Sequence, residues 1–327
     1  MDSTPLDAAL RKLAPRLGGE LAGPARRLSG GASQETWAFD LTTGGGKTRR
    51  LILRKRPDGL ERDPDRTAGL DTEAALIRLA EAAGAPVPGV VHVCEPEDGL
   101  GEAYVMARIE GETLGRRIVR DEAFARVRPG LAYRCGEVLA RIHAITLADL
   151  PLLPRSDASA ELEKYEEIYR RSGAERPIFE LAFKRLRRQA PPELSPVLVH
   201  GDFRNGNLMI HPEHGLTAVL DWELAHVGDP AADLGWLCVN SWRFGGDKPV
   251  GGFGDYADLL AGYEAGGGEP VALERLLYWQ TLGSLKWGVM CLIMYGAYAS
   301  GGDPSVERAM IGRRVSETEI DLVNLLA

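Results

Sequence analysis

A short β-rich segment, residues 197–221, interrupts a half of the chain whose apolar pattern is otherwise helical. An apolar run leads into the polar loop HGDFRNGN (200–207), and a second apolar run, AVLD, ends at Asp221. Apolar runs of this length, bounded by polar turns, predict strands. We expect the two strands to bring Asp202, Asn207 and Asp221 to a common edge. The fold must therefore place a small β element inside a helical lobe.

The first hundred or so residues have the pattern of a mainly antiparallel sheet with one inserted helix. Two β-rich runs, 35–41 and 50–55, flank a GGGK turn, which is a hairpin signature. Residues 68–84 have the apolar spacing of a helix that stops at Gly84. Further strands are expected in VVHVCE and AYVMARIE, and a short amphipathic helix is expected at the N-terminus.

From Gly111 onward the pattern changes to long helical segments. These expected helices are 121–147, 158–189, 254–265, 271–299 and 305–326. The sequence thus predicts an α+β fold with a small β-rich lobe (1–105), a hinge (106–110) and a larger helical lobe (111–327). A cleft between two lobes is a natural place for a ligand.

Composition excludes several classes of protein. A net charge of −8 argues against a general nucleic-acid binder, which needs clustered Lys and Arg. Four scattered cysteines without a CxxC pair indicate neither a disulfide framework nor a zinc site, and they favour reduced thiols. The apolar run 287–299 is too short to span a bilayer. We expect a soluble, cytoplasmic protein without a membrane or nucleic-acid partner; its oligomeric state is not predicted.

The oxygen-rich side chains of the β segment indicate a particular chemistry. The Asn207 amide and the Asp221 carboxylate suit Mg²⁺ and not zinc. Magnesium held by few protein ligands usually shares its coordination shell with nucleotide phosphates. Asp202 is then free to accept a hydroxyl proton or to orient the hydroxyl for attack. An Asp that precedes the metal-binding Asn by five positions is also the spacing of the kinase catalytic loop.

HGDFRNGN, followed by LDWE and GDPAADLGW, resembles the aminoglycoside phosphotransferase and choline-kinase-like family, which has a protein-kinase-like fold. The resemblance extends from the glycine loop near residue 30 to the last helices. It implies that Asp202 is the catalytic Asp and that Asn207 and Asp221 are the magnesium ligands. It also implies that His200 and Asp233 support the loop, and that ATP and Mg²⁺ are the cofactors.

A kinase-type site also needs groups that bind phosphates. The loop LSGGASQE offers glycines for close backbone approach and two polar side chains as donors. These candidate nucleotide-binding residues are Gly30, Gly31, Ser33 and Gln34. On the strand LILRKR, the resemblance places the family's cation, usually a lysine, at Arg54. Arginine is planar and forked, so the exchange is not neutral; Lys55 is a less favoured substitute.

The resemblance also assigns partners to this cation and to the adenine ring. Glu73 matches the acid that pairs with the strand cation, although a solvated surface glutamate is the alternative. YVMARIEGETL matches the strand that joins the lobes. There the Ala107 carbonyl and the Ile109 amide would bind adenine, with Met106 behind them.

The acceptor is the least constrained part of the prediction. The segment after Asp233 mixes aromatic and basic residues with few acids, so it offers no dense trap for a polycation. The run WELAHVGDPAADLGWLC resembles the branch related to the kinase-like domains of acyl-CoA dehydrogenase fusion proteins. That branch implies a hydroxyacyl-CoA-type substrate. The alternatives are an aminoglycoside or choline/ethanolamine kinase, and a nucleotide-binding pseudokinase without catalysis.

Other polar residues are interpreted structurally. His211 and His214 resemble a metal pair but lie at an expected hairpin turn, so we interpret them as surface residues. His143 is expected in the core, and Asp229 is expected to cap the next helix. No role follows from the sequence for Arg204 or Asn205 beyond their place beside the catalytic Asp.

Overall fold

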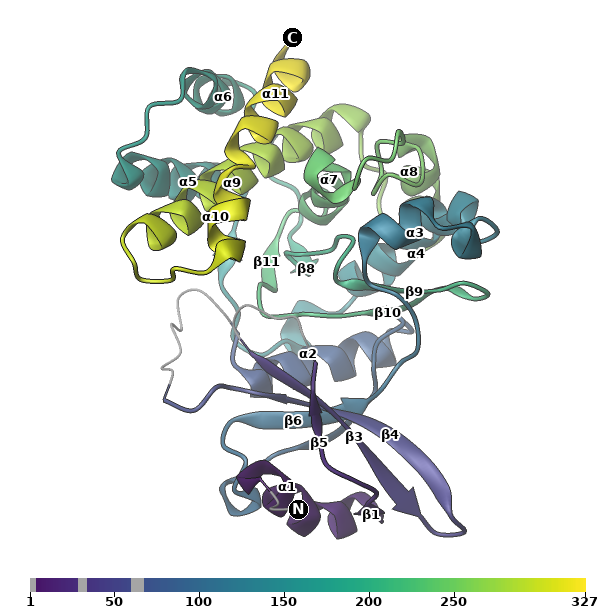
Figure 1. The fold of residues 1–327 in the computed structure, drawn as a ribbon. Helices are drawn as coiled ribbons and strands as arrows, with labels where there is room; N and C mark the ends of the chain where they lie inside the picture. The colour runs from purple at the N-terminus through teal and green to yellow at the C-terminus, as the bar shows by residue number, and fades with distance from the viewer. Residues whose placement is uncertain (1–3, 29–33, 60–67) are drawn as a thin grey trace.

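An antiparallel sheet forms the N-terminal part of the chain in a computed structural model, and the remainder is mainly helical (Figure 1). The structure describes residues 4–28, 34–59 and 68–327. It confirms the predicted α+β arrangement of a β-rich lobe and a larger helical lobe. Within the described ranges, none of the helices combines the length and the apolar character that crossing a bilayer requires.

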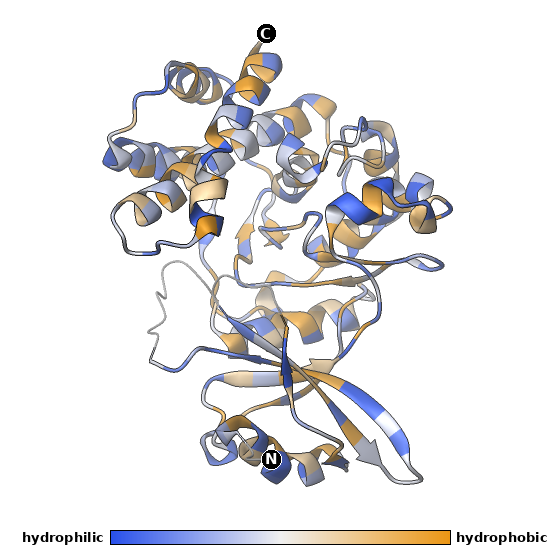
Figure 2. Ribbon diagram, viewed as in Figure 1, coloured by the Kyte–Doolittle hydropathy of each residue, from blue (hydrophilic) through white to orange (hydrophobic). Residues whose placement is uncertain are grey.

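The β3–β4 hairpin is the centre of the small lobe. The strands of this sheet are β1 (Gly19–Leu21), β2 (Arg26–Arg27), β3 (Glu35–Thr43), β4 (Lys47–Lys55), β5 (Val90–Val93) and β6 (Ala103–Ala107). Their order is β1-β3-β4-β6-β5, with β2 also paired to β3. Glu35 pairs with Lys55 and Thr43 with Lys47, so the predicted GGGK hairpin is confirmed. The outer half of β4 is exposed and hydrophilic (Figure 2).

Two helices cover opposite faces of this sheet. α1 (Pro5–Leu13) packs with Leu51 and Leu53 of β4 in a small core of its own. α2 (Leu70–Ala82) contacts β5 and β6 on the side that faces the large lobe (Figure 1). Because side chains alternate along a strand, Arg54 points away from α1 and toward α2.

In the large lobe, the expected helices 254–265 and 271–299 are present as α8 and α9, and the other expected helices are divided into shorter ones. The helices of this lobe have the following bounds. They are α3 (Gly115–Arg120), α4 (Leu131–His143), α5 (Ala158–Ser172), α6 (Pro177–Arg188), α7 (Ala231–Cys238), α8 (Tyr256–Ala265), α9 (Leu273–Ala299), α10 (Val306–Gly312) and α11 (Val315–Leu326). The expected helix 158–189 is wrong as one element, because Gly173 adopts a left-handed conformation that ends α5, and Pro177 starts α6. The expected helices 121–147 and 305–326 are also each interrupted.

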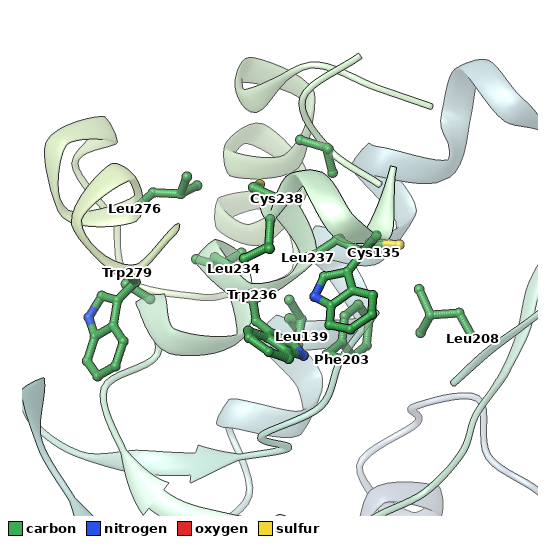
Figure 3. Packing of buried hydrophobic residues seen from close by; sticks show 14 of the residues in the cluster. Cys135, Leu139, Phe203, Leu208, Leu234, Trp236, Leu237, Cys238, Leu276 and Trp279 are labelled. Atoms are coloured by element: carbon green, nitrogen blue, oxygen red, sulfur yellow. The ribbon is translucent and has the colours of Figure 1, made fainter. Parts of the chain in front are cut away.

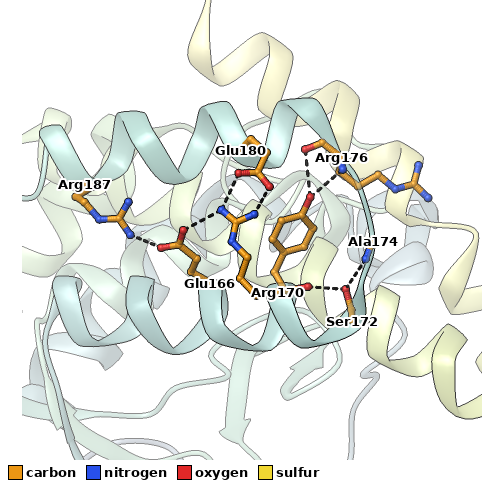
Figure 4. Close-up of polar contacts among 8 residues, drawn as sticks. Glu166, Arg170, Ser172, Ala174, Arg176, Glu180 and Arg187 are labelled. Carbon is orange, nitrogen blue, oxygen red and sulfur yellow. Dashed lines mark hydrogen bonds and ion pairs between the residues drawn. The ribbon is translucent and has the colours of Figure 1, made fainter.

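α5 and α6 run antiparallel and are joined by a network of ion pairs (Figure 4). Glu166 contacts both Arg170 and Arg187, and Arg170 also contacts Glu180. The arginine side chains are about half exposed, so these pairs contribute little to stability. Apolar contacts hold the pair instead: Tyr169 of α5 packs on the α6 aromatics Phe179 and Phe183.

The predicted β segment is present, but its strands belong to two sheets. β8 (Val197–Val199) pairs with β11 (His226–Gly228), which also pairs with β7 (Arg155–Ser156). β9 (Leu208–His211) pairs instead with β10 (Gly215–Val219). The polar loop 200–207 therefore crosses from one sheet to the other. Phe203 of this loop and Leu208 at the start of β9 are buried in the main core of the large lobe (Figure 3).

Two glycines let α4 and α8 cross closely. A Cβ atom at Gly136 of α4 would lie 2.2 Å from the Leu259 carbonyl oxygen, and one at Gly262 of α8 would lie 2.0 Å from the Tyr133 carbonyl oxygen. These contacts are with backbone atoms, which cannot move aside as a flexible side chain can. The packing of the large lobe therefore depends on the absence of side chains at both positions.

We predict that Gly136→Ala lowers the free energy of unfolding by about 1–3 kcal/mol, because the added methyl group forces the two helices apart. Gly296→Ala is the matched control, since the Cβ position at this helical glycine is open. There alanine should raise the free energy of unfolding by about 0.5–1 kcal/mol. Urea denaturation of the two variants measures both effects, and equal effects would contradict the close crossing.

Candidate functional site

The backbone conformation of the loop 200–207 depends on two glycines. Gly201 has φ +83°, and a Cβ atom there would lie 2.3 Å from the Leu224 carbonyl oxygen. Gly206 has φ +110°, and its Cβ position is 2.5 Å from Nη1 of Arg204. Gly201 is thus required by conformation and by space, because a backbone oxygen cannot move aside, whereas Gly206 is required by its conformation. They give the loop the tight path that brings its polar side chains together.

Asp233, fully buried at the start of α7, anchors the beginning of this loop. Its carboxylate accepts hydrogen bonds from the backbone amides of His200 (2.7 Å) and Gly201 (2.9 Å), and it contacts Nε2 of His143 (3.2 Å). Burial opposes ionisation of Asp233, but the contacts with His143 and His200 outweigh it and hold its pKa below the ordinary value. Asp233 is therefore a charged, hydrogen-bonded support for the loop, and His143 lies in the core as expected.

His200 connects the loop to the strand that precedes Asp221. Its Nε2 lies 3.1 Å from the Leu220 carbonyl oxygen, and its Nδ1 accepts a hydrogen bond from the Asp202 amide at 3.2 Å. Burial lowers the pKa of His200, so the ring is neutral at pH 7. A neutral ring with its proton on Nε2 satisfies both contacts.

The carboxylate of Asp202 is held by three side chains. Its Oδ1 accepts hydrogen bonds from Trp236 Nε1 (2.7 Å) and from Arg204 Nε (2.8 Å). Its Oδ2 accepts a hydrogen bond from Asn207 Nδ2 at 2.6 Å. The side chain of Asp202 is 12% exposed. These three hydrogen bonds hold the carboxylate in a fixed orientation and leave only a small part of it exposed.

Arg204 and Asn205, which had no role from sequence, have different environments. Asn205 is fully buried, and its amide nitrogen donates to the carbonyl oxygens of Trp242 and Gly251. It therefore fastens the loop to the large lobe. Arg204 lies over the ring of Trp242, 4.3 Å from the centroid, and remains partly exposed beside Asp202.

Asn207 and Asp221 lie close to each other because their backbones are bonded. The Leu220 amide donates to the Asn207 carbonyl oxygen at 2.8 Å, which places Asp221 next to the loop. Asp221 has φ +68°, a conformation that is uncommon outside glycine and often marks functional sites. The side-chain nitrogen Nδ2 of Asn207 donates to Asp202. The side-chain oxygen Oδ1 of Asn207 is therefore the group that can ligate a cation. Two oxygen donors, one of them a carboxylate, fit Mg²⁺.

Arg54 joins the two lobes through a cluster of buried charges. Its Nε lies 3.0 Å from Oε2 of Glu73, and its Nη2 contacts Asp221. Glu73 has no exposed surface, so the alternative of a solvated glutamate is wrong. Burial raises the pKa of Glu73, while the Arg54 guanidinium opposes that shift. Lys55, the less favoured substitute, points elsewhere and contacts Asp58.

The candidate nucleotide-binding residues are only partly described. Gly30, Gly31 and Ser33 lie outside the described residues, and Gln34 immediately precedes β3. Met106 and Ala107 end β6, opposite Ile52 and Leu51 of β4. Ile109 follows in the extended segment that leads into the large lobe. The roles of all these residues remain predictions.

Sequence reasoning missed two residues of this site. Trp236 belongs to the aromatic segment after Asp233 and had no assigned role, yet it donates a hydrogen bond to Asp202. Its position three residues after Asp233, on the first turns of α7, was the available signal. Lys286 of α9 lies with its Nζ 5.0 Å from the centroid of the Trp236 ring. It is 50 residues further along the chain, and no local pattern connects it to the loop.

Known proteins match this chain in sequence and in fold. The sequence model of the phosphotransferase enzyme family matches residues 24–276. The mouse (Mus musculus) acyl-CoA dehydrogenase family member 10 is 31% identical over 253 residues, which are 72% of this chain and 22% of that protein. The chain therefore spans less than a quarter of that relative's length.

Solved structures extend the likeness over nearly the whole chain. A structure from Ralstonia eutropha, provisionally named an aminoglycoside phosphotransferase, has a TM-score of 0.72 at 23% identity and covers 98% of this chain and 96% of that one. A spectinomycin phosphotransferase solved with ADP and spectinomycin has a TM-score of 0.62 at 15% identity, covering 96% and 97%. These likenesses confirm the protein-kinase-like, two-lobed fold.

The buried, neutral His200 should make the free energy of unfolding depend on pH. In the unfolded chain a histidine titrates near pH 6.5, so below that pH the unfolded state binds a proton that the folded state resists. The free energy of unfolding should therefore fall as the pH drops below 6.5, with His200 contributing up to about 1.4 kcal/mol per pH unit.

Denaturation of the wild type and His200→Gln between pH 7.5 and 5.5 measures this contribution. The variant should show a shallower loss of stability on acidification. His214→Gln, at an exposed position, should retain the wild-type slope. Identical slopes in wild type and His200→Gln would contradict the assignment of a neutral His200.

Proposed function

Because the chain belongs to the phosphotransferase enzyme family, we propose that it transfers the γ-phosphate of ATP to a hydroxyl group of a small molecule. The observation that carries the proposal is the arrangement of Asp202, Asn207 and Asp221 beside the cation Arg54. The Asp202 carboxylate has a fixed orientation, Asn207 donates a hydrogen bond to it, and the Arg54 guanidinium contacts Asp221. This is the set of groups that phosphoryl transfer needs.

Asp202 acts on the acceptor. The hydroxyl oxygen forms a bond to the γ-phosphorus, the bond from that phosphorus to the bridging oxygen of ADP breaks, and the hydroxyl proton passes to Asp202. A carboxylate has about four lone-pair positions, and three hydrogen bonds occupy three of them. The remaining position is available to the acceptor hydroxyl. Trp236 and Asn207 keep the carboxylate in that orientation.

Asn207, Asp221 and Arg54 act on the phosphates. Asn207 and Asp221 would hold Mg²⁺, and the bound ion would neutralise charge on the phosphate oxygens. Arg54 contacts Glu73 through Nε and Asp221 through Nη2. Lysine has only one nitrogen, Nζ, and could not contact both carboxylates in the same geometry. The exchange of lysine for arginine is thus compatible with a charged group at the phosphates. The adenine contacts at Met106, Ala107 and Ile109 and the phosphate contacts of the loop around Gly30 complete the nucleotide site.

The similarity to acyl-CoA dehydrogenase family members supports a hydroxyacyl-CoA-type acceptor. Aminoglycosides and choline or ethanolamine are the alternative acceptors. Incubation of the protein with ATP, Mg²⁺ and 4-hydroxyacyl-CoAs tests the choice directly. A phosphorylated thioester detected by mass spectrometry supports the proposal, and turnover of an aminoglycoside or choline without it refutes this acceptor.

A second candidate function is binding of a nucleotide without catalysis. The presence of arginine at position 54, where the family usually has lysine, favours this candidate. The two candidates differ in slow hydrolysis of ATP. An enzyme of this kind transfers phosphate to water at a low rate, and a pseudokinase binds Mg·ATP without turnover.

We predict that Asp202→Asn retains ATP affinity within about threefold and reduces turnover by two or more orders of magnitude, because the amide accepts no proton. Phosphate release from ATP and calorimetric titration with ATP measure the two effects. Asp258→Asn, at an exposed position of α8, is the matched control and should leave both unchanged. Wild-type turnover in Asp202→Asn would refute the role of Asp202.

A further inference from the structure

A cavity of about 640 Å³ lies beside the residues that follow Asp221. Its walls come from both lobes: the start of α2, the segment Glu223–His226, helix α5 and Lys286 of α9. A separate cavity of about 30 Å³ shares Glu161, His226 and Lys286 with it and is also lined by Gly201 and Trp236. This smaller cavity therefore borders the loop 200–207, next to the indole that bonds to Asp202.

Lys286 lines both cavities. Its side chain is 16% exposed, and its Nζ lies over two aromatic rings, 5.0 Å from the centroid of Trp236 and 5.4 Å from that of Tyr165. Trp236 contacts Lys286 with its ring face and Asp202 with its Nε1. The ammonium group and the catalytic carboxylate are thus held by the same side chain, on the wall that an acceptor would contact.

The positive charge of Lys286 is only partly balanced. Glu161 is its nearest carboxylate, with 3.8 Å between Nζ and Oε2, which is long for a direct ion pair. The same carboxylate also faces Lys164 (3.7 Å) and accepts a hydrogen bond from Ser156 (3.0 Å). Two lysines therefore share one carboxylate on the α5–α9 wall. Burial opposes the charge on Lys286, but Tyr165, Glu161 and Asp202 outweigh it and raise its pKa, so it is protonated at pH 7.

The other acids of the cavity, Glu223 and Asp71, and its other basic residues, Arg155 and His226, lie on other elements. Glu223 is 3.8 Å from Arg54, and Asp71 is on the first turn of α2. Arg155 belongs to β7. The wall formed by α5 and α9 thus carries a local excess of positive charge next to the place of phosphate transfer. A desolvated ammonium group with a weak partner binds an anion more strongly than an exposed one does.

From this geometry we infer that the cavity binds the phosphate acceptor and that Lys286 binds an acidic group on it. The acceptors are then alcohols that also carry a carboxylate or phosphate group. The inference rests on the proposed phosphotransferase function and narrows its substrate class. Lys286 is a specificity-determining residue in this assignment, and Lys164 and Tyr165 support it. A polycationic acceptor such as an aminoglycoside does not fit this wall.

Binding of matched probe pairs to the full chain, saturated with ADP and Mg²⁺, tests this inference. The pairs are 4-hydroxybutyrate with 1,4-butanediol and glycerol 3-phosphate with glycerol, which differ in the acidic group. The wild type should bind at least one acidic probe ten or more times more tightly than its neutral partner. Lys286→Met should remove this preference and leave ADP affinity unchanged. Lys184→Met, at an exposed position of α6, should retain the preference.

Three results would overturn the inference: no acidic probe binds more tightly than its neutral partner, the preference survives Lys286→Met, or that variant loses ADP affinity instead. Glu161→Gln provides a second variant, which should change the affinity for the acidic probe in the opposite direction. Removal of the competing carboxylate should tighten binding of the acidic probe several-fold, and weaker binding would contradict the role of Lys286.

Binding and transfer distinguish the two proposals. Binding of an acidic probe through Lys286 without any phosphate transfer would refute the proposed function and leave the anion site intact. Phosphorylation of neutral alcohols in preference to acidic ones would refute the anion site and leave the phosphotransferase function intact.

Discussion

The contact of Arg54 with Glu73 and Asp221 is the interaction on which the arrangement of the two lobes depends. It joins a strand of the small lobe, the helix α2 and the end of a strand in the large lobe. Arg54 and Glu73 have little or no exposed surface, whereas the Asp221 side chain is 27% exposed. Buried charges are costly unless they are paired, so removal of Arg54 would leave Glu73 without its cationic partner. The cluster therefore connects the small lobe to the end of the strand beside loop 200–207, and it places the Arg54 guanidinium next to Asp221, where we propose that phosphates bind.

The loop 200–207 depends on a second buried charge. Asp233 holds the backbone at His200 and Gly201, His200 reaches Leu220, and Leu220 is bonded to Asn207. These contacts form a closed path around Asp202, which gives its carboxylate one orientation. Rigid support of this kind is what electrostatic catalysis needs, since groups that are already oriented pay no reorganisation cost during the reaction. The cavity lined by Lys286 adds a charged wall to this frame.

Local patterns in the sequence were sufficient for the β3–β4 hairpin, for α2 and for the proximity of Asp202, Asn207 and Asp221. Pairings between distant segments were not predictable in this way. β8 pairs with β11 instead of its neighbour β9, and Lys286 reaches Trp236 from a different helix. Helix breaks at Gly173 and Pro177 were visible in the sequence but were outweighed by the apolar periodicity around them. Periodicity reports which face is buried, and it does not report what covers that face.

The dependence of ATP affinity on Mg²⁺, compared between the wild type and Asp221→Asn, tests the central claim most directly. Asparagine tolerates the left-handed backbone of this position, so the substitution removes charge with little strain. If Asn207 and Asp221 hold the metal that binds the phosphates, Mg²⁺ should strengthen ATP binding to the wild type at least tenfold, and Asp221→Asn should lose most of that gain. Equal strengthening in both proteins, measured by calorimetric titration, would contradict the account.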